Sequence, residues 1–590
     1  GDNQCTGDEY NYVEDKYEKN KEWMAEKRIK GFYKMYGYLS FANSVKNLLD
    51  DNLKNIPKKD YLTRKEKERE IIQNNYSNRV LIIDEVHNIR NDENNNKMNK
   101  ESIRDTIFYI EKVIKYSQNL KLILLTANPM FNNYNEIVWI LNMLLMNDNR
   151  EVIKNKIEFD SKNELTKESQ EMIRYKSRGY ISYLRGENPF TFPIRLYPQK
   201  KDKLLESGIQ NDIFGNPIDS IFDLSFLKLY KSTLKGRQLM ILSNELDKLN
   251  ETIKISEESK LLQLSNCCYP SKSDDIEDMY GKVGIMNCFS TKGDSKKYSY
   301  KKDIPNFLDL SELNNYSSKI YNIIKNINKS DGISFIYSNY LESGVLPLIL
   351  ALEQNGYKHY SGNEIFINKD KSEPISYEGK LYSKYKDKKK FKQGKYIVIS
   401  GSFDSGLNLT QKNFKKELEK AVSQGNSDGS EIKIIIGSTM AAEGLDFKNI
   451  RSIHLLEPWH NLNKLEQVIG RGIRNCSHML LDPKDRNVTI YLYTTIIKKR
   501  ETIETYLYRR CEIKSKQIGQ LELILKDVAI DKYLFRNANI IQEDDVKEID
   551  VKPSYRTHNI IKIKPIDYPY TRSCSFLEDC DYIKEKSFSV

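Results

Sequence analysis

The sequence has 590 residues, of which 39% are hydrophobic and 30% are charged, and its formal net charge is +11. This composition excludes a disordered chain and favours a globular protein. No apolar run reaches the roughly 18 residues of a membrane span, so we expect no membrane partner, and the longest run, residues 137–146, predicts a buried helix. The length predicts three or four domains of about 150 residues each. The positive charge suits a polyanionic partner, although a lysine-rich composition explains it equally well.

The pattern of the first 150 residues is that of an α/β unit. Residues 37–43 resemble a short strand that enters a helix, and residues 55–77, rich in Lys, Arg and Glu, predict a solvated connection or an exposed helix. The apolar run over residues 79–84 predicts a strand buried on both faces of a parallel sheet. An amphipathic helix around 102–116 and a second buried strand over 121–126 complete a βαβ unit.

The rest of the chain contains a second α/β unit between less regular segments. Residues 185–195 combine arginine and aromatic side chains, which suits stacking on bases, although a packed loop is the stronger interpretation. Helical patterns and Ser-, Asp- and Lys-rich loops over about 200–315 predict an accessory insertion. Basic helical and irregular patterns follow from about residue 500. The strands of the second unit are predicted at 332–337, 396–400, 432–436 and 452–456.

Eight cysteines are scattered along the chain, and none forms a CxxC pair. We therefore predict neither a zinc site nor a disulfide framework, with Cys574 and Cys580 at most half of a metal site. The sequence shows no signal peptide, so we expect a reducing, intracellular setting. The first residue is Gly rather than Met, from which we expect a processed or internal piece of a longer protein.

Two adjacent acids, Asp84 and Glu85, end the first predicted strand, and His87 follows them. Hydrolysis of ATP needs Mg²⁺ on the terminal phosphates and a base that orients the attacking water. We predict that Asp84 binds Mg²⁺ through water, that Glu85 contacts the metal site and the attacking water, and that His87 hydrogen-bonds across the cleft. An acidic turn after a strand is the alternative, and the apolar run before these residues argues against it.

A hydroxyl ends the next predicted strand at Thr126, beside Ala127. We predict that these two residues couple the acidic pair to nucleic acid. Taken alone the segment fits an ordinary strand-ending turn equally well, and its position one βαβ unit after Asp84 favours the coupling role. After the strand at 432–436, Ser438 and Thr439 are candidates to hold a nucleic-acid phosphate.

Gly444, Asp446 and Gly470 are candidate nucleotide-binding residues, with Asp446 placed to meet a ribose. Gln467, Arg471 and Arg474 have the spacing of one helical face. Arginines placed in this way suit the terminal phosphate of a nucleotide held by the other domain, as an arginine finger requires. A basic surface helix is the alternative, and we favour the phosphate role because glycines flank Arg471.

The segments DEVH (84–87), TAN (126–128), STMAAEGLD (438–446) and QVIGRGIR (467–474) together resemble motifs II, III, V and VI of superfamily 2 helicases. Longer stretches at 124–145, 179–198, 473–478 and 501–506 resemble helicases and early-transcription ATPases of nucleocytoplasmic large DNA viruses, including the poxvirus early transcription factor small subunit and asfarvirus proteins. The similarity covers about residues 35–200 and 320–545.

The resemblance implies two RecA-like parallel-sheet domains, a mainly helical insertion and a C-terminal extension. The corresponding segments are 1–150, 151–315, 316–500 and 501–590. The phosphate-binding motif GxxxxGK[ST], which the family carries before motif II, does not occur in the sequence. We therefore expect the first domain to be incomplete at its amino end and to lack a central strand, with the motif upstream in the full protein or lost. Asn128 also replaces the last hydroxyl of the usual motif III.

The leading hypothesis is an ATP- and Mg²⁺-dependent helicase or translocase. The alternatives are a DNA-binding early transcription factor that hydrolyses ATP without separating strands, and a non-catalytic module whose partner supplies the phosphate loop. The motifs contact phosphate and sugar and leave DNA and RNA both open, and we favour DNA. The resemblance also implies a viral RNA polymerase or another transcription factor subunit as a partner. It implies a location in the cytoplasmic viral factory or the virion.

Overall fold

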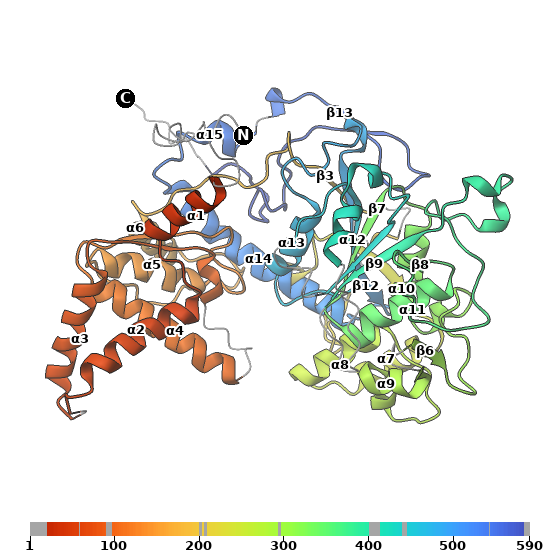
Figure 1. The fold of residues 1–590 in the computed structure, drawn as a ribbon, viewed down its shortest axis with the longest axis horizontal. Helices are drawn as coiled ribbons and strands as arrows, with labels where there is room; N and C mark the ends of the chain where they lie inside the picture. Colours follow the sequence, from red (N-terminus) through yellow and green to blue (C-terminus); the bar gives the residue numbers. More distant parts are fainter. Residues whose placement is uncertain are drawn as a thin grey trace. The chain divides into compact units, whose positions relative to one another are not determined.

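The computed structural model describes residues 21–57, 59–89, 97–199, 203–205, 209–292, 297–400, 414–438, 445–541 and 543–582. The chain divides into two compact units (Figure 1). Unit 1 comprises Gly1–Pro129 and Glu136–Lys154, and unit 2 comprises Met130–Asn135 and Asn155–Val590.

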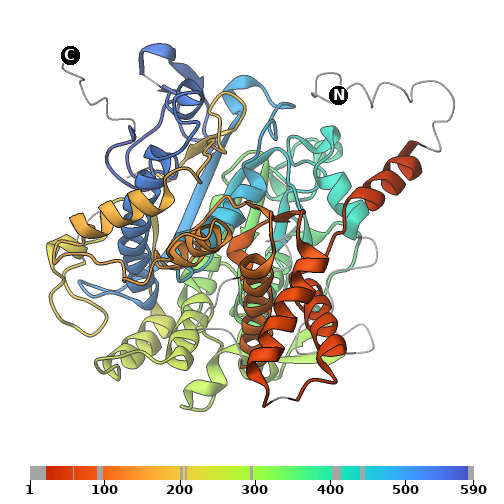
Figure 2. The same cartoon turned by 90° about the vertical axis from the view of Figure 1, so that its left-hand side faces the viewer.

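Unit 1 consists of helices around one short parallel sheet. Three of the helices, α2, α3 and α4, pack side by side (Figure 2), and Val45, Ile72 and Val113 meet in their common core. The structure confirms the predicted βαβ unit, since β1 and β2 pair in parallel on either side of α4 in the sequence. The elements are α1 (Lys21–Phe32), α2 (Tyr38–Leu53), α3 (Tyr61–Tyr76), β1 (Val80–Ile83), the 3-10 turn η2 (Val86–Ile89), α4 (Lys97–Tyr116), β2 (Lys121–Leu124) and α5 (Glu136–Asn147).

Two local expectations for unit 1 are wrong. Residues 37–43 contain no strand, because α2 begins directly after Gly37 and buries Ala42, Val45 and Leu49 at helical spacing. The strands are also not buried on both faces: the side chains of Val80 and Ile82 are 58% and 48% exposed. Within the described residues β1 and β2 form a sheet of two strands.

Unit 2 is organised around a large parallel sheet with the strand order β3-β12-β11-β7-β10-β9-β8. β3 and β4 pair with successive halves of the long strand β12. This sheet confirms the predicted α/β class and all four predicted strands. The strands are β3 (Ile194–Leu196), β4 (Leu229–Thr233), β7 (Ile333–Tyr337), β8 (Lys358–His359), β9 (Lys395–Ile399), β10 (Ile434–Gly437), β11 (Ile450–Leu455) and β12 (Asn487–Ile496).

Alternate residues of the central strands face two separate hydrophobic cores. In β9, Tyr396 and Val398 pack with α10 and α11 on one side, whereas Ile397 and Ile399 pack with α12, α13 and α14 on the other. In a parallel sheet that is covered on both faces, the carboxyl ends of the strands lie along one edge. The loops that leave this edge carry polar side chains. The helices are α10 (Ser318–Ile327), α11 (Leu346–Gln354), α12 (Phe414–Ala421), α13 (Leu462–Gly472) and α14 (Ile503–Asp527).

Residues 200–315 contribute to this sheet as well as to peripheral structure. They supply β4, and Cys267, Tyr269 and Phe289 lie in the core that contains α10 and α11. The boundaries of the four sequence segments remain a prediction. The remaining elements of unit 2 are α6 (Lys167–Ser177), α7 (Gly236–Asp247), α8 (Ile255–Asn266), α9 (Gly281–Cys288), α15 (Arg536–Asn539), the hairpin β5 (Phe289–Lys292) and β6 (Lys297–Tyr300), and the pair β13 (Ile549–Val551) and β14 (Ile561–Ile563).

The C-terminal extension contains a disulfide between Cys574 and Cys580, contrary to the expectation from the cysteine spacing. Turns over 571–577, with Ser575 and Phe576 at positive φ, bring the two Cα atoms to 4.3 Å. Among the described residues, no group of three or more His, Cys, Asp or Glu side chains could hold a metal ion. No helix in the described part of the chain has the length and apolar character needed to cross a membrane.

Candidate functional site

In unit 1, the candidate acids lie on a constrained turn at the carboxyl end of β1. Asp84 and Glu85 are exposed, and Glu85 adopts φ 47°, a left-handed conformation that is costly for a residue other than glycine. The turn is held by the Tyr38 hydroxyl, which donates to the carbonyl oxygen of Asp84 at 2.5 Å. The Asp84 carboxylate also accepts the Glu85 backbone N–H at 3.0 Å. The backbone is therefore shaped to present two carboxylates outward.

His87 connects this turn to the end of the neighbouring strand. Its side chain is buried, and its Nδ1 lies 2.8 Å from the Thr126 hydroxyl and 3.3 Å from a carboxylate oxygen of Glu85. The Thr126 hydroxyl accepts the backbone N–H of Asn128 at 3.0 Å. The structure thus brings together His87, Glu85 and Thr126. Ala127, next to Thr126, is exposed.

The acidic turn fits a bound magnesium nucleotide in its donor chemistry. Mg²⁺ prefers oxygen ligands and is usually held by one or two carboxylates together with substrate phosphates and waters. The exposed carboxylates of Asp84 and Glu85 offer such oxygens. When bound, the metal would neutralise charge on the phosphates, while Glu85 would orient a water by a hydrogen bond and His87 would link Glu85 to Thr126.

In unit 2, the candidate residues lie after β10 and at the end of α13. Ser438 follows β10 and is buried, and its backbone N–H donates to the carbonyl oxygen of Ile399 at 3.1 Å. Thr439 and Gly444 lie outside the described residues. Asp446 is exposed, and the backbone N–H of the next residue, Phe447, donates to the carbonyl oxygen of Arg471 at 2.9 Å. The two motifs of this unit are therefore held against each other by their backbones.

The prediction that Gln467, Arg471 and Arg474 share one helical face is wrong for Arg474. α13 ends at Gly472, because Ile473 adopts an extended conformation with φ −119° and ψ 92°. Gln467 and Arg471 lie on the helix and are half-buried. Arg474 lies beyond the helix, and its Nε donates back to the carbonyl oxygen of Gly470 at 3.1 Å.

Arg474 and Asp446 form an ion pair with an N–O distance of 2.7 Å. The two side chains are 41% and 58% exposed, so the pair is a surface one and contributes about 0–1 kcal/mol. Such a weak pair can be exchanged at small cost for a phosphate, which accepts stronger charge-assisted hydrogen bonds. The pairing therefore leaves Arg474 suited to an anion.

The two glycines around Arg471 differ in their surroundings. A Cβ atom at Gly472 would lie 3.1 Å from Ile453 Cδ1 and 3.3 Å from Ile450 Cβ, so this glycine lets α13 approach β11 closely. At Gly470 a Cβ atom would meet no described atom within 4 Å. The close packing of α13 against β11 therefore explains why residue 472 is a glycine. Gly470 faces open space within the described structure.

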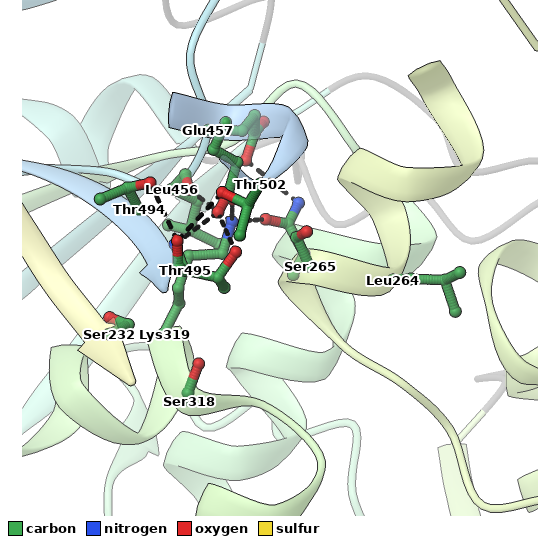
Figure 3. Close-up of polar contacts among 12 residues, drawn as sticks. Ser232, Leu264, Ser265, Ser318, Lys319, Leu456, Glu457, Thr494, Thr495 and Thr502 are labelled. Carbon is green, nitrogen blue, oxygen red and sulfur yellow. Dashed lines mark hydrogen bonds and ion pairs between the residues drawn. The ribbon is translucent and has the colours of Figure 1, made fainter. Parts of the chain in front are cut away.

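A buried ion pair lies at the carboxyl end of the same sheet (Figure 3). Lys319 of α10 and Glu504 of α14 are both fully buried and paired with each other. The Lys319 ammonium also donates to Asn266 Oδ1 at 2.6 Å and to the carbonyl oxygen of Leu456 at 2.7 Å, so all three of its donors are used. Glu504 accepts the backbone N–H and the hydroxyl of Thr495, both at 2.6 Å.

Glu457, two residues after the end of β11, extends this network. Its carboxylate accepts the Ser338 hydroxyl at 3.0 Å, the Asn266 amide at 3.1 Å and the backbone N–H of Asn339. Burial raises the pKa of Glu457, and the nearby Lys319 ammonium and these hydrogen bonds oppose that rise. The network joins the ends of β7, β11 and β12 to α8, α10 and α14.

The segment between Glu457 and α13 is held from α14. The Cys511 thiol donates to the carbonyl oxygen of Trp459 at 3.0 Å, and Lys514 Nζ donates to that of His460 at 3.0 Å. The Asn461 side chain then caps α13 by accepting the backbone N–H of Lys464 at 2.9 Å. The segment that leads into the helix with Gln467 and Arg471 is therefore held in part by α14.

Comparison with known proteins finds a domain match within unit 2 and similar viral proteins over most of the chain. The helicase conserved C-terminal domain matches residues 378–476. Two proteins of Acanthamoeba polyphaga mimivirus, each named "Putative ATP-dependent RNA helicase", are 27% and 26% identical to the chain over 88% and 89% of its length. A termination factor NPH-I homolog of African swine fever virus is 23% identical over 77% of the chain.

The chain is similar in sequence to viral proteins named as putative helicases.

This helicase relative matches only part of several of those proteins: it covers 47% and 75% of the two mimivirus proteins and 63% of the African swine fever virus protein. The helicase domain match ends at residue 476, before α14 begins. Sequence reasoning noted the stretch that contains Glu504 but assigned it no role, and it missed Lys319 and Glu457. An acid two residues after a buried strand, as at Glu457, is the signal that could have been used.

Proposed function

We propose that this helicase relative is the motor portion of an ATP- and Mg²⁺-dependent nucleic-acid helicase or translocase. Asp84 and Glu85 serve the metal and the attacking water, and Arg471 and Arg474 neutralise phosphate charge. Thr126, Ala127, Ser438 and Thr439 serve nucleic-acid contact and coupling. We further propose action on DNA in viral transcription or genome processing, within the viral factory or the virion.

The contact between His87 and Thr126 carries this proposal. A purely structural acidic turn has no need for a buried histidine that joins Glu85 to the hydroxyl at the end of the next strand. In a motor, such a contact links the residue that orients water to a loop that senses nucleic acid. The helicase domain match and the ATP-dependent helicase names of the mimivirus proteins support the same reading.

The test compares ATP hydrolysis by the protein expressed from its complete reading frame with that by its Glu85→Gln variant, with and without nucleic acid. We expect nucleic acid to stimulate hydrolysis, and the isosteric amide to reduce turnover at least about 100-fold, since it cannot act as a base. His87→Gln should retain basal hydrolysis and lose most of the stimulation. Unchanged turnover in Glu85→Gln would refute the assignment.

A second candidate is an ATPase that acts in transcription without separating strands. The similarity to the African swine fever virus termination factor NPH-I homolog favours it. Strand-displacement and promoter-binding assays on one preparation distinguish the two candidates. Efficient displacement with no preference for promoter sequence supports the helicase, and promoter binding without displacement supports the transcription ATPase.

A further inference from the structure

The connection between β8 and β9 carries an unusual concentration of positive charge. Between residues 380 and 395 the sequence contains eight lysines and one acid, Asp387. β8 is the terminal strand of the large sheet, so this connection lies at the edge of unit 2. None of the motif residues discussed above belongs to it.

Internal contacts give this loop a defined shape. Phe391 makes edge-to-face contacts with Tyr382 and Tyr385, with ring centroids 4.9 Å and 5.3 Å apart. Lys388 Nζ lies 4.2 Å from the centre of the Tyr382 ring and donates to the Tyr382 carbonyl oxygen at 2.7 Å. Two short 3-10 turns, Tyr382–Lys384 and Lys388–Lys390, are thereby folded onto a small aromatic cluster. These contacts order the loop.

Three acidic side chains near this loop accept hydrogen bonds from residues of the loop. Glu373 accepts the backbone N–H and the hydroxyl of Ser383 at 2.8 Å and 2.7 Å. Glu378 accepts Lys380 Nζ at 2.9 Å and the Tyr385 hydroxyl at 3.1 Å. Asp387 caps the second 3-10 turn by accepting the Lys389 backbone N–H at 3.0 Å. These carboxylates therefore stabilise the loop, and only Glu378 forms an ion pair with one of its lysines.

Five lysines of the loop remain outward-facing. Their side chains are exposed, and they form no ion pair or hydrogen bond through their ammonium groups in the described part of the chain. Like charges held together on an ordered loop repel one another unless an external anion neutralises them. This basic loop set consists of Lys384, Lys386, Lys389, Lys390 and Lys392.

We propose that the basic loop set binds the phosphate backbone of the nucleic acid on which the protein acts, outside the helicase motifs. The proposal rests on the proposed function and extends it. Lysines act as flexible point charges that suit repeated phosphates without reading sequence. Tyr382, a residue 39% exposed beside these lysines, adds an aromatic side chain that can contact a base. An acidic protein segment offers fewer charges per unit length than a nucleic acid, so the nucleic acid is the better match.

The experiment measures binding of a labelled single strand and a labelled duplex to the 590-residue chain across a salt series. The test variant changes all five lysines of the basic loop set to Gln. The matched control changes five exposed lysines elsewhere in unit 2 to Gln, namely Lys282, Lys301, Lys302, Lys498 and Lys499. Circular dichroism and thermal melting verify that both variants fold like the wild type.

We expect the loop variant to bind at least about 10-fold more weakly than the control at moderate salt. Each lost phosphate contact makes the slope of log affinity against log salt shallower by about 0.7 for single strands and 0.9 for duplexes, so three lost contacts change it by about 2 or more. Affinity should fall equally for unrelated sequences.

Three results would overturn the inference in distinguishable ways. If the wild-type chain binds neither polymer, the proposed function fails with it. If the wild type binds and the loop variant keeps the affinity and slope of the control, the inference alone fails. If poly-glutamate displaces nucleic acid from the wild type as well as unlabelled nucleic acid does, and the loop variant loses binding to both, the surface is one for acidic proteins.

Discussion

Lys433, at the start of β10, provides a quantitative test of the electrostatics of unit 2. It is 1% exposed, and its ammonium donates to the carbonyl oxygens of Ser330 and Gly332 at 2.7 Å and 2.6 Å. Its pKa is lowered to about 7, mainly by burial, with Arg556 and Arg451 also lowering it and Asp331 opposing them. The perturbation is Lys433→Met, which keeps most of the side-chain volume and removes the titrating group.

The expected effect follows from proton binding in the two states. In the unfolded chain the lysine keeps its proton up to about pH 10.5, whereas in the folded protein it loses the proton near pH 7. Between these values the unfolded state binds the extra proton, so stability rises with pH by about 1.4 kcal/mol per unit. Below pH 7 both states are protonated, and the cost of burying the charge is fully present.

The assay is urea unfolding between pH 7 and 9, followed by fluorescence of Trp459, in a background where Trp23 and Trp139 of unit 1 are replaced by Phe. The difference in unfolding free energy between wild type and Lys433→Met should change by about 2–3 kcal/mol over this range, in favour of the wild type at high pH. Lys448→Met, at an exposed position, is the control. The same pH dependence in wild type and Lys433→Met would refute the reasoning.

Two further predictions concern the helicase motifs and their support. Lys319→Met should destabilise unit 2 by about 3–5 kcal/mol in urea unfolding, because it leaves Glu504 charged and buried, and adding Glu504→Gln should recover part of that loss. A double variant as unstable as Lys319→Met would contradict this account. Asp446→Asn should change stability by less than about 1 kcal/mol, because its pair with Arg474 is exposed. Arg474→Ala should be equally mild in unfolding yet lower ATP turnover of the complete protein, and unaltered turnover would count against its phosphate role.

The parts of the fold predicted from the sequence are those with a strong local signal. The continuous apolar runs that became β7, β9, β10 and β11 identified the second α/β unit. β12 and β4 were missed: β12 mixes Thr and Tyr with aliphatic residues, and β4 pairs with a strand more than 250 positions further along the chain. The burial of β1 was overestimated, because an apolar run shows which residues can be buried and not which neighbours cover them.

In the candidate site, too, local sequence patterns predicted which residues share a helix but not where the helix ends or which distant residues it contacts. The i, i+4 spacing correctly placed Gln467 and Arg471 on one helix, but the extended conformation of Ile473 after Gly472 left no trace in that spacing. From the sequence, Arg185 and Arg195 fitted both a base-stacking segment and a packed loop, because their partners lie far away in the chain. Arg185 pairs with Asp567 at 2.8 Å and Arg195 pairs with Glu466 at 2.8 Å, so this stretch is packed within unit 2.

The position of α14 gives a physical reason for a helicase C-terminal unit to extend past its last motif. This helix supplies Glu504, which pairs with Lys319. It also supplies Cys511 and Lys514, which donate hydrogen bonds to the backbone between Glu457 and α13. An arginine that must meet a phosphate within a few tenths of an ångström needs a helix whose start is held from outside. Since α13 has only 11 residues, its stability and its orientation depend on tertiary contacts rather than on its own hydrogen bonds. Truncation before Ile503 should therefore expose Lys319 and loosen α13 together, even though every residue of the family match would remain.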